Sequence, residues 1–267
     1  MSDDRVTCTI ADGVADVRFN RPEKRNALDG AMFNAIVATG ERLRHTPGVR
    51  AVVVSGEGHS FCAGLDFSSF QAMAGGGNII GDRPEIPADS PVAALGQQAV
   101  YVWRMIPAPV IAAVHGHALG GGFQLALGAD LRIVAPTAQM SVLEIRWGLI
   151  PDMCGTQLLP PLVGLERAKE LTFTGRMIDG HEAVRIGLAS KVADDPRAEA
   201  LALAAELAAK SPDALRVSKQ LLENAAAAGL VEGFKAEQVG IRSLIGHPNQ
   251  VEAVKAFFEK RAPSFAD

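Results

Sequence analysis

The segment Val110–Val114 restricts the fold more than any other part of the chain. It is an apolar run that begins after Pro109 and leads to the triplet Gly120–Gly122. A short apolar run with such boundaries is typical of a buried strand, and the mostly apolar residues 123–127 indicate a helix after the triplet. Leu131–Val134 has the composition of a further strand. The order strand, glycine turn, helix and strand predicts an α/β fold.

The N-terminal part of the chain supplies more β structure. The runs Thr7–Ile10 and Val14–Phe19 flank Ala11-Asp12-Gly13 and predict a hairpin, because glycine adopts a positive φ at little cost. Asp29 is placed to cap a helix, and apolar residues recur after it at helical spacing: Met32, Phe33, Ile36, Val37 and Leu43. Ala51–Val54 is then a predicted buried strand.

The last third of the chain has a different pattern. From about Leu165 onward the sequence favours helices, of which three are clearest: Ala198–Ala209, Pro212–Leu222 and Gln250–Lys260. We therefore divide the chain into residues 1–195 and a helical region, residues 196–267.

Composition limits the partners. The chain has 267 residues, 48% of them hydrophobic, and its net charge of −4 comes without a basic run that would bind nucleic acid or an anionic membrane. It has no apolar stretch of about 18 residues that would span a membrane. Its three cysteines are too far apart for a zinc site or a disulfide framework: Cys8, Cys62 and Cys154. We expect a cytoplasmic protein that binds a small molecule or another copy of itself.

Several catalytic motifs are missing. Residues 58–62 resemble a hydrolase nucleophile elbow but have Cys62 where the second glycine is needed, and neither a dinucleotide fingerprint nor a phosphate loop occurs. We therefore expect no NAD, FAD or ATP. His115 and His117 have the spacing of metal ligands, but no further ligand is clustered with them. We interpret them as packed or surface histidines and expect no metal.

Two segments that contain glycine and two carboxylates are the remaining candidates for catalytic groups. Residues 61–66 and 119–123 each place glycine, which allows a close approach of the backbone, after a strand, and the second segment opens a helix whose first N–H groups lack partners. Two such groups directed at one point would hold an oxyanion, although either segment could be only a tight turn. Glu144 lies among apolar residues, so its side chain either points outward or is a base whose pKa is shifted by its surroundings. Asp152 is a second acid or a helix cap.

Together these motifs resemble the crotonase superfamily, the enoyl-CoA hydratases and isomerases. The matching segments cover almost the whole chain in the family order: Asn20-Arg21-Pro22, Asn26-Ala27-Leu28, residues 61–66, 109–114 and 120–122, Gly148-Leu149-Ile150-Pro151, Thr174-Gly175-Arg176 and Phe258-Glu259-Lys260-Arg261. The resemblance implies a spiral of ββα units, a C-terminal helical region that builds trimers or hexamers, and a site for acyl-CoA thioesters. CoA would be part of the substrate, so no separate cofactor is expected.

The resemblance also implies roles for individual residues. The backbone N–H groups of Leu65 and Gly121 would form the oxyanion hole. CoA would lie near the backbone of four residues of one subunit and two of a neighbouring subunit: Arg25, Ala27, Ala63 and Asp66, and Phe257 and Lys260. We expect the walls of the acyl pocket to come from the glycine- and proline-rich segment 72–91, which we interpret as a mobile flap, and from Phe67, Phe70 and Trp103.

One departure from the family pattern decides the predicted reaction. Family hydratases use two glutamates, of which the second matches Glu144, whereas Gln124 stands in place of the first. An amide cannot exchange the proton that hydration needs, but moving a double bond requires only one base. We therefore predict a 3-enoyl-CoA or 3,5-dienoyl-CoA isomerase, with Asp152 as the second acid of a dienoyl enzyme. The alternatives are a 2-enoyl-CoA hydratase of fatty-acid β-oxidation and a protein of this fold that binds acyl-CoA or a macromolecule without catalysis.

Overall fold

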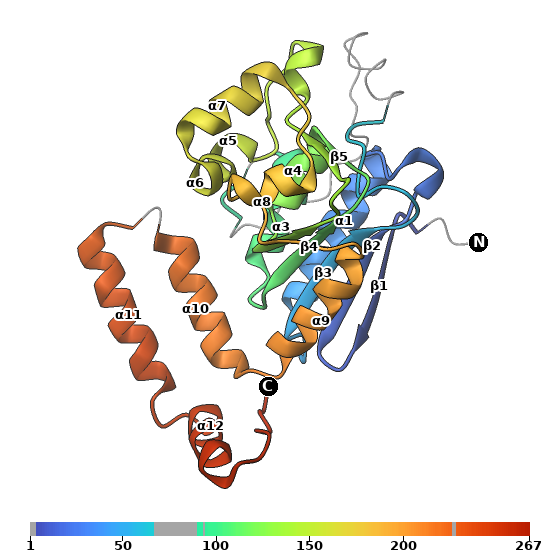
Figure 1. Ribbon diagram of the computed structural model, residues 1–267. Helices are drawn as coiled ribbons and strands as arrows, with labels where there is room; N and C mark the ends of the chain where they lie inside the picture. The colour runs from blue at the N-terminus through green and yellow to red at the C-terminus, as the bar shows by residue number, and fades with distance from the viewer. Residues whose placement is uncertain (1–3, 67–89, 93, 226–227) are drawn as a thin grey trace.

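A six-stranded sheet forms the centre of the molecule in the computed structural model, which describes residues 4–66, 90–92, 94–225 and 228–267 (Figure 1). Its strands are β1 (Val6–Ala11), β2 (Val14–Phe19), β3 (Ala51–Gly56), β4 (Val110–Val114), β6 (Leu131–Val134) and β8 (Lys191–Val192). They lie in the order β1-β2-β3-β4-β6-β8; β1 and β2 pair antiparallel and the other neighbours pair in parallel. The predicted hairpin and the three predicted strands are confirmed.

Successive strands alternate between this sheet and a second one. The second sheet pairs β5 (His117–Leu119) with β7 (Gln139–Ser141) in parallel. Strand β4 leads to β5 and then to helix α4 (Gly121–Leu127), and β6 leads to β7 and then to the 3-10 helix η2 (Glu144–Trp147). Residue Cys62, after β3, also pairs with Ala118 of β5. This repeated path is the predicted spiral of ββα units.

Two helical layers cover the large sheet. Helices α1 (Gly30–Arg44) and α3 (Leu95–Met105) pack on one face, and α9 (Pro196–Ala208) packs on the other. Alternate residues of β3 enter separate clusters, because successive side chains of a strand point to opposite faces: Val52 and Val54 in one, Ala51 and Val53 in the other. Asp29 caps α1 as predicted, since its Oδ1 accepts a hydrogen bond from Met32 N at 2.7 Å.

Helix α9 belongs to the core rather than to the C-terminal helical region. The sequence division at residue 195 groups it with the helical region, but its Ala200 and Ala204 are fully buried against Val53 and Ile111 of the sheet. Small side chains let a helix approach a sheet closely, so α9 completes the core. The core therefore extends through residue 208.

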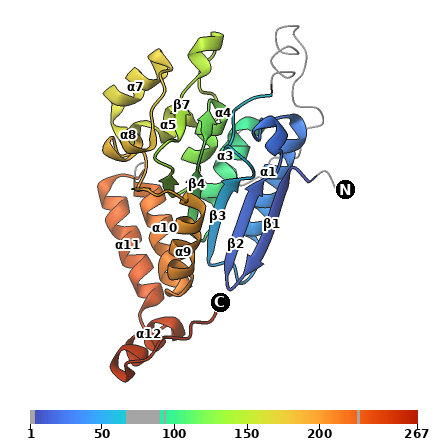
Figure 2. The same cartoon turned by 45° about the vertical axis from the view of Figure 1, so that its right-hand side comes forward.

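The remaining helices form two groups (Figure 1). Four short helices gather at one end of the core: α5 (Gly155–Leu158), α6 (Pro160–Val163), α7 (Leu165–Thr174) and α8 (Gly180–Arg185). A short 3-10 helix, η1 (Pro22–Lys24), follows the hairpin. Three longer helices project from the core and are called the C-terminal arm: α10 (Pro212–Ala225), α11 (Leu230–Leu244) and α12 (Pro248–Glu259) (Figure 2). No helix within the described ranges is long and apolar enough to cross a membrane.

Polar contacts join both ends of the arm to the core. Lys219 on α10 approaches Asp130 Oδ2 at 2.8 Å and donates to the carbonyl of Ala108 at 3.1 Å. Beyond α12, the chain returns to the core, where Arg50 donates to Phe265 O at 2.8 Å and to Asp267 Oδ1 at 2.9 Å. The arm is therefore held at its start and near the end of the chain.

Candidate functional site

A largely apolar cavity of about 680 Å³ opens at the end of the core where the two glycine segments meet. Both segments line it, at residues 63–65 and 119–121. Among the described residues, its acidic side chains are Glu144 and Asp152. The expected wall residue Trp103 does not contribute, because it is buried within the core. Phe67, Phe70 and most of the predicted flap, residues 72–89, lie outside the described residues.

The two glycine segments lie side by side. Leu119 N donates to Cys62 O at 3.1 Å. A Cβ at Gly64 would lie 2.6 Å from Leu119 O, and one at Gly122 would lie 2.1 Å from Cys62 O. No larger residue fits at these two positions, so the glycines allow the segments to touch. The structure brings together the two segments that the sequence singled out.

The orientation of two peptide groups determines where Leu65 and Gly121 point their N–H groups. Gly64 O accepts from Leu28 N at 2.8 Å, and Gly120 O accepts from Gln124 N at 3.0 Å. A trans peptide directs its C=O and N–H in opposite directions. The N–H of Leu65 therefore points away from Leu28, and that of Gly121 points out of the start of α4. Both residues line the cavity; that their N–H groups converge on one point stays a prediction.

Glu144 is a carboxylate set into the cavity wall. It begins η2, is 9% exposed, and its Oε1 accepts from Gln124 Nε2 at 2.6 Å. Its Oε2 is buried without a partner among the described residues. Burial raises the pKa of Glu144, the hydrogen bond from Gln124 opposes this, and the charge of Asp152 adds to the increase. A desolvated carboxylate with an unpaired oxygen is suited to accept a proton from a bound molecule.

Gln124 lies behind Glu144 rather than in the cavity wall. It is buried, and its Oε1 accepts from Met153 N and Gly155 N, both at 2.9 Å. Two backbone donors at the oxygen assign the amide orientation, which leaves Nε2 to face the carboxylate. Gln124 therefore anchors Glu144. The sequence identifies both residues but not this contact, because the two amides come from a turn about thirty residues away.

Asp152 occupies the mouth of the same cavity. Its side chain is exposed and its charge acts on Glu144. The alternative interpretation as a helix cap is wrong for the next helix, because Cys154 is the N-cap of α5. The two carboxylates thus border one cavity, one buried and one in water.

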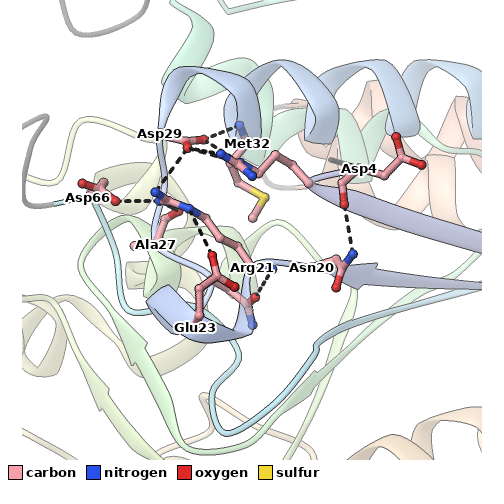
Figure 3. Close-up of polar contacts among 10 residues, drawn as sticks. Asp4, Asn20, Arg21, Glu23, Ala27, Asp29, Met32 and Asp66 are labelled. Atoms are coloured by element: carbon pink, nitrogen blue, oxygen red, sulfur yellow. Dashed lines mark hydrogen bonds and ion pairs between the residues drawn. The ribbon is translucent and has the colours of Figure 1, made fainter. Parts of the chain in front are cut away.

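Four of the predicted CoA contacts lie together beside the cavity. Ala63 N donates to Arg25 O at 3.0 Å, and Arg21 Nη1 joins Ala27 O to the carboxylate of Asp66 (Figure 3). Arg21 belongs to a motif of the sequence, but the sequence alone assigns it no role. No periodicity or spacing connects it with Asp66, which lies 45 residues later.

The two other predicted CoA contacts lie on the C-terminal arm. Phe257 is 79% exposed on α12, and Lys260 follows as the C-cap of this helix. Both views place α12 far from the core within one chain (Figures 1 and 2). Their contact with CoA in a neighbouring subunit stays a prediction.

The histidines and cysteines make other contacts. His117 Nδ1 lies 3.0 Å from Ser60 Oγ, and His115 Nε2 lies 3.0 Å from Gly58 O. In the described part of the chain, no group of three or more potential metal-ligating side chains occurs. All three cysteines are free thiols, and burial raises the pKa of Cys62 to about 12.

Comparisons with known proteins extend over almost the whole chain. A family model described as enoyl-CoA hydratase/isomerase matches residues 9–267. A Mycobacterium leprae protein named as a probable enoyl-CoA hydratase is 36% identical over 254 residues, which are 94% of each chain. The human mitochondrial enoyl-CoA hydratase domain-containing protein 2 is 34% identical over 269 residues, 95% of this chain and 85% of that protein. The crystal structure of an enoyl-CoA hydratase from Polaromonas superposes with a TM-score of 0.86 at 31% identity, covering 98% of this chain and 99% of the other.

Proposed function

The chain belongs to the enoyl-CoA hydratase/isomerase family, and we propose that it moves a double bond along the acyl chain of a CoA thioester. The substrate is a 3-enoyl-CoA or a 3,5-dienoyl-CoA. Glu144 removes a proton from C2, and the N–H groups of Leu65 and Gly121 bind the enolate oxygen. In the 3-enoyl case the same carboxyl returns the proton at C4, which restores the carboxylate and leaves a 2-enoyl thioester. No atom is gained or lost.

The contact between Gln124 and Glu144 carries this proposal. Hydration needs one group to deprotonate water and another to supply a proton at C2. Here the neighbour of Glu144 is an amide, whose oxygen is occupied by two backbone donors and whose nitrogen donates to the carboxylate. Glu144 is thereby held as a single base. Asp152 at the cavity mouth supports the dienoyl variant, in which a second acid carries the proton over a longer span.

A 2-enoyl-CoA hydratase is the second candidate, because several relatives are named hydratases. Turnover of a 3-enoyl-CoA and of crotonyl-CoA by the wild-type protein in one buffer distinguishes the two functions. We expect isomerisation to be faster by at least about tenfold. Rapid hydration of crotonyl-CoA with Gln124 in place would favour the hydratase.

The variant Gln124→Glu tests the contact between Gln124 and Glu144 by replacing the amide with a carboxyl group. One carboxylate oxygen would keep the donors Met153 N and Gly155 N, and the other would face Glu144 Oε1 at about the present 2.6 Å. Two carboxyl groups at this separation share a proton, so the variant gains a proton-exchanging group. We expect hydration of crotonyl-CoA to rise modestly and isomerisation to fall. The matched control is Gln97→Glu, which adds a carboxylate to the cavity wall away from this contact.

We further propose that the protein assembles as a trimer or hexamer through its C-terminal arm. The exposed apolar side chains on α11 and α12 support this assembly. In it, Phe257 and Lys260 would approach the CoA of a neighbouring subunit.

A further inference from the structure

Arg21 is a half-buried cation between two segments that border the cavity. Its side chain is 13% exposed. One nitrogen, Nη1, donates to Ala27 O at 3.1 Å and to Asp66 Oδ2 at 2.6 Å, and Nη2 lies 3.5 Å from Asp29 Oδ2 (Figure 3). The guanidinium is planar and donates in fixed directions, so it sets the distance between the segments that it joins.

A chain of peptide groups leads from Arg21 to the N–H of Leu65. Arg21 holds Ala27 O, and the N–H on the opposite side of that peptide, Leu28 N, donates to Gly64 O at 2.8 Å. The N–H on the opposite side of the next peptide belongs to Leu65. Each hydrogen bond in such a chain polarises the next one. The cation thus lies two peptide groups away from the N–H of Leu65.

Arg21 also holds the other side of Leu65. Asp66 N donates to Leu28 O at 2.9 Å, and the Asp66 carboxylate accepts from Arg21. Leu65 is therefore bracketed by Gly64 and Asp66, both of which are tied to the segment that Arg21 fixes. Gly64 has φ +90° and no side chain to restrict its backbone, so the position of this segment depends on the contacts that hold it.

We infer that Arg21 is a positioning residue for the oxyanion hole, which acts by holding the N–H of Leu65 in place. This inference rests on the proposed binding of the thioester oxygen by Leu65. It applies equally to isomerisation and to hydration, because both pass through a thioester enolate. Arg21 itself does not line the cavity.

The kinetic test compares Arg21→Ala with the matched control Arg5→Ala. Arg5 also pairs with Asp29, at 3.0 Å, so the control removes a cation from that carboxylate while Arg21 keeps its bonds to Ala27 and Asp66. For Arg21→Ala we expect kcat to fall about 10- to 100-fold, since loss of an oxyanion donor costs about 100-fold or more. We expect KM to change less than about threefold, because the bond to the oxygen strengthens mainly in the transition state. Arg5→Ala should keep kcat within about twofold.

A spectroscopic test does not need turnover. A saturated acyl-CoA with a ¹³C-labelled thioester carbonyl is bound to each variant, and the carbonyl band is measured by infrared difference spectroscopy. We expect wild type and Arg5→Ala to lower its frequency equally, and Arg21→Ala to lose most of that shift. Guanidinium chloride at millimolar concentration should restore part of the shift and of kcat to Arg21→Ala. Arg21→Lys keeps the positive charge but lacks the planar guanidinium, so its kcat and carbonyl shift should lie between those of wild type and Arg21→Ala. This variant also provides the test if Arg21→Ala does not fold.

The outcomes separate this inference from the proposed isomerisation. A carbonyl shift in wild type without isomerase turnover would contradict the reaction and leave the positioning role supported. An equal shift in Arg21→Ala and Arg5→Ala, or an equal loss of kcat, would overturn the positioning role. Absence of any shift in the wild type would overturn the role of Leu65 and the inference together.

Discussion

The core and the C-terminal arm differ in how their apolar residues are covered. In the core, the residues of β3 and β4 are all buried beneath helices of the same chain. In the arm, large apolar side chains remain open to solvent, among them Leu222, Phe234, Phe257 and Phe258. One chain therefore brings together the described residues of the cavity, whereas the proposed assembly would cover the exposed apolar residues of the arm. Core substitutions should therefore change the chemistry, and arm substitutions should change assembly and CoA binding.

The largest effect should come from Glu144→Gln in the core. The variant keeps the shape of the cavity but has no group to accept the C2 proton. We expect kcat for a 3-enoyl-CoA to fall by at least about 10³-fold, within the range known for removal of a general base. Binding of a saturated acyl-CoA, measured by calorimetry, should stay within about threefold. Retained turnover would show that the base lies elsewhere.

Gly121→Val should have the next largest effect. Its Cβ would lie 2.9 Å from Leu28 Cδ1 and 3.1 Å from Met153 Sδ, and the rest of the valine side chain would extend into these cavity-lining residues, so they or the start of α4 must shift. We expect kcat to fall about 100-fold or more, the cost of losing one oxyanion donor. Gly233→Val in the arm is the matched control, because a Cβ there meets nothing within 4 Å. If both variants lost activity equally, the difference between the two regions would not hold.

The double variant Phe257→Ser and Phe258→Ser tests the arm directly. The two rings are highly exposed and contact each other with centroids 5.7 Å apart. We expect sedimentation to show a smaller assembly, with KM for acyl-CoA raised by about tenfold and a circular dichroism spectrum that keeps the signal of the core. A wild-type protein that is already a monomer at micromolar concentration, with full activity, would refute the proposed assembly.

The smallest expected effect concerns pH and stability. Because burial raises the pKa of Glu144, the folded state binds more protons than the unfolded state between the two pKa values. Folding stability therefore decreases as pH rises through this range and lacks that contribution above the folded pKa. Glu144→Gln removes the free-energy cost of a buried charged carboxylate. Its melting temperature should therefore exceed that of wild type by a few degrees at pH 8 and by less at pH 5. An increase in melting temperature that is larger at pH 5 than at pH 8 would contradict the raised pKa of Glu144.

Local signals in the sequence predict much of the fold. The hairpin, the cap at Asp29 and the buried strands depend on residues close together in the chain, and the structure confirms them. The sequence division places helix α9 in the wrong region, because alanines on several sides conceal which face is buried. Within the site, the sequence identifies the glycine segments and Glu144, but the donors that orient Gln124 and the pairing of Arg21 with Asp66 depend on contacts across distant segments.

The contact of Arg50 with the end of the chain has a consequence for biosynthesis. The hydrogen bond from Arg50 to Asp267 spans 217 positions of sequence. A ribosome makes the chain from its N-terminus, so residues of the sheet and the cavity can pack while the arm is still being synthesised. The arm cannot be fastened at both ends until residue 265 has emerged. We therefore expect newly made chains to acquire a folded core before they become competent to associate with one another.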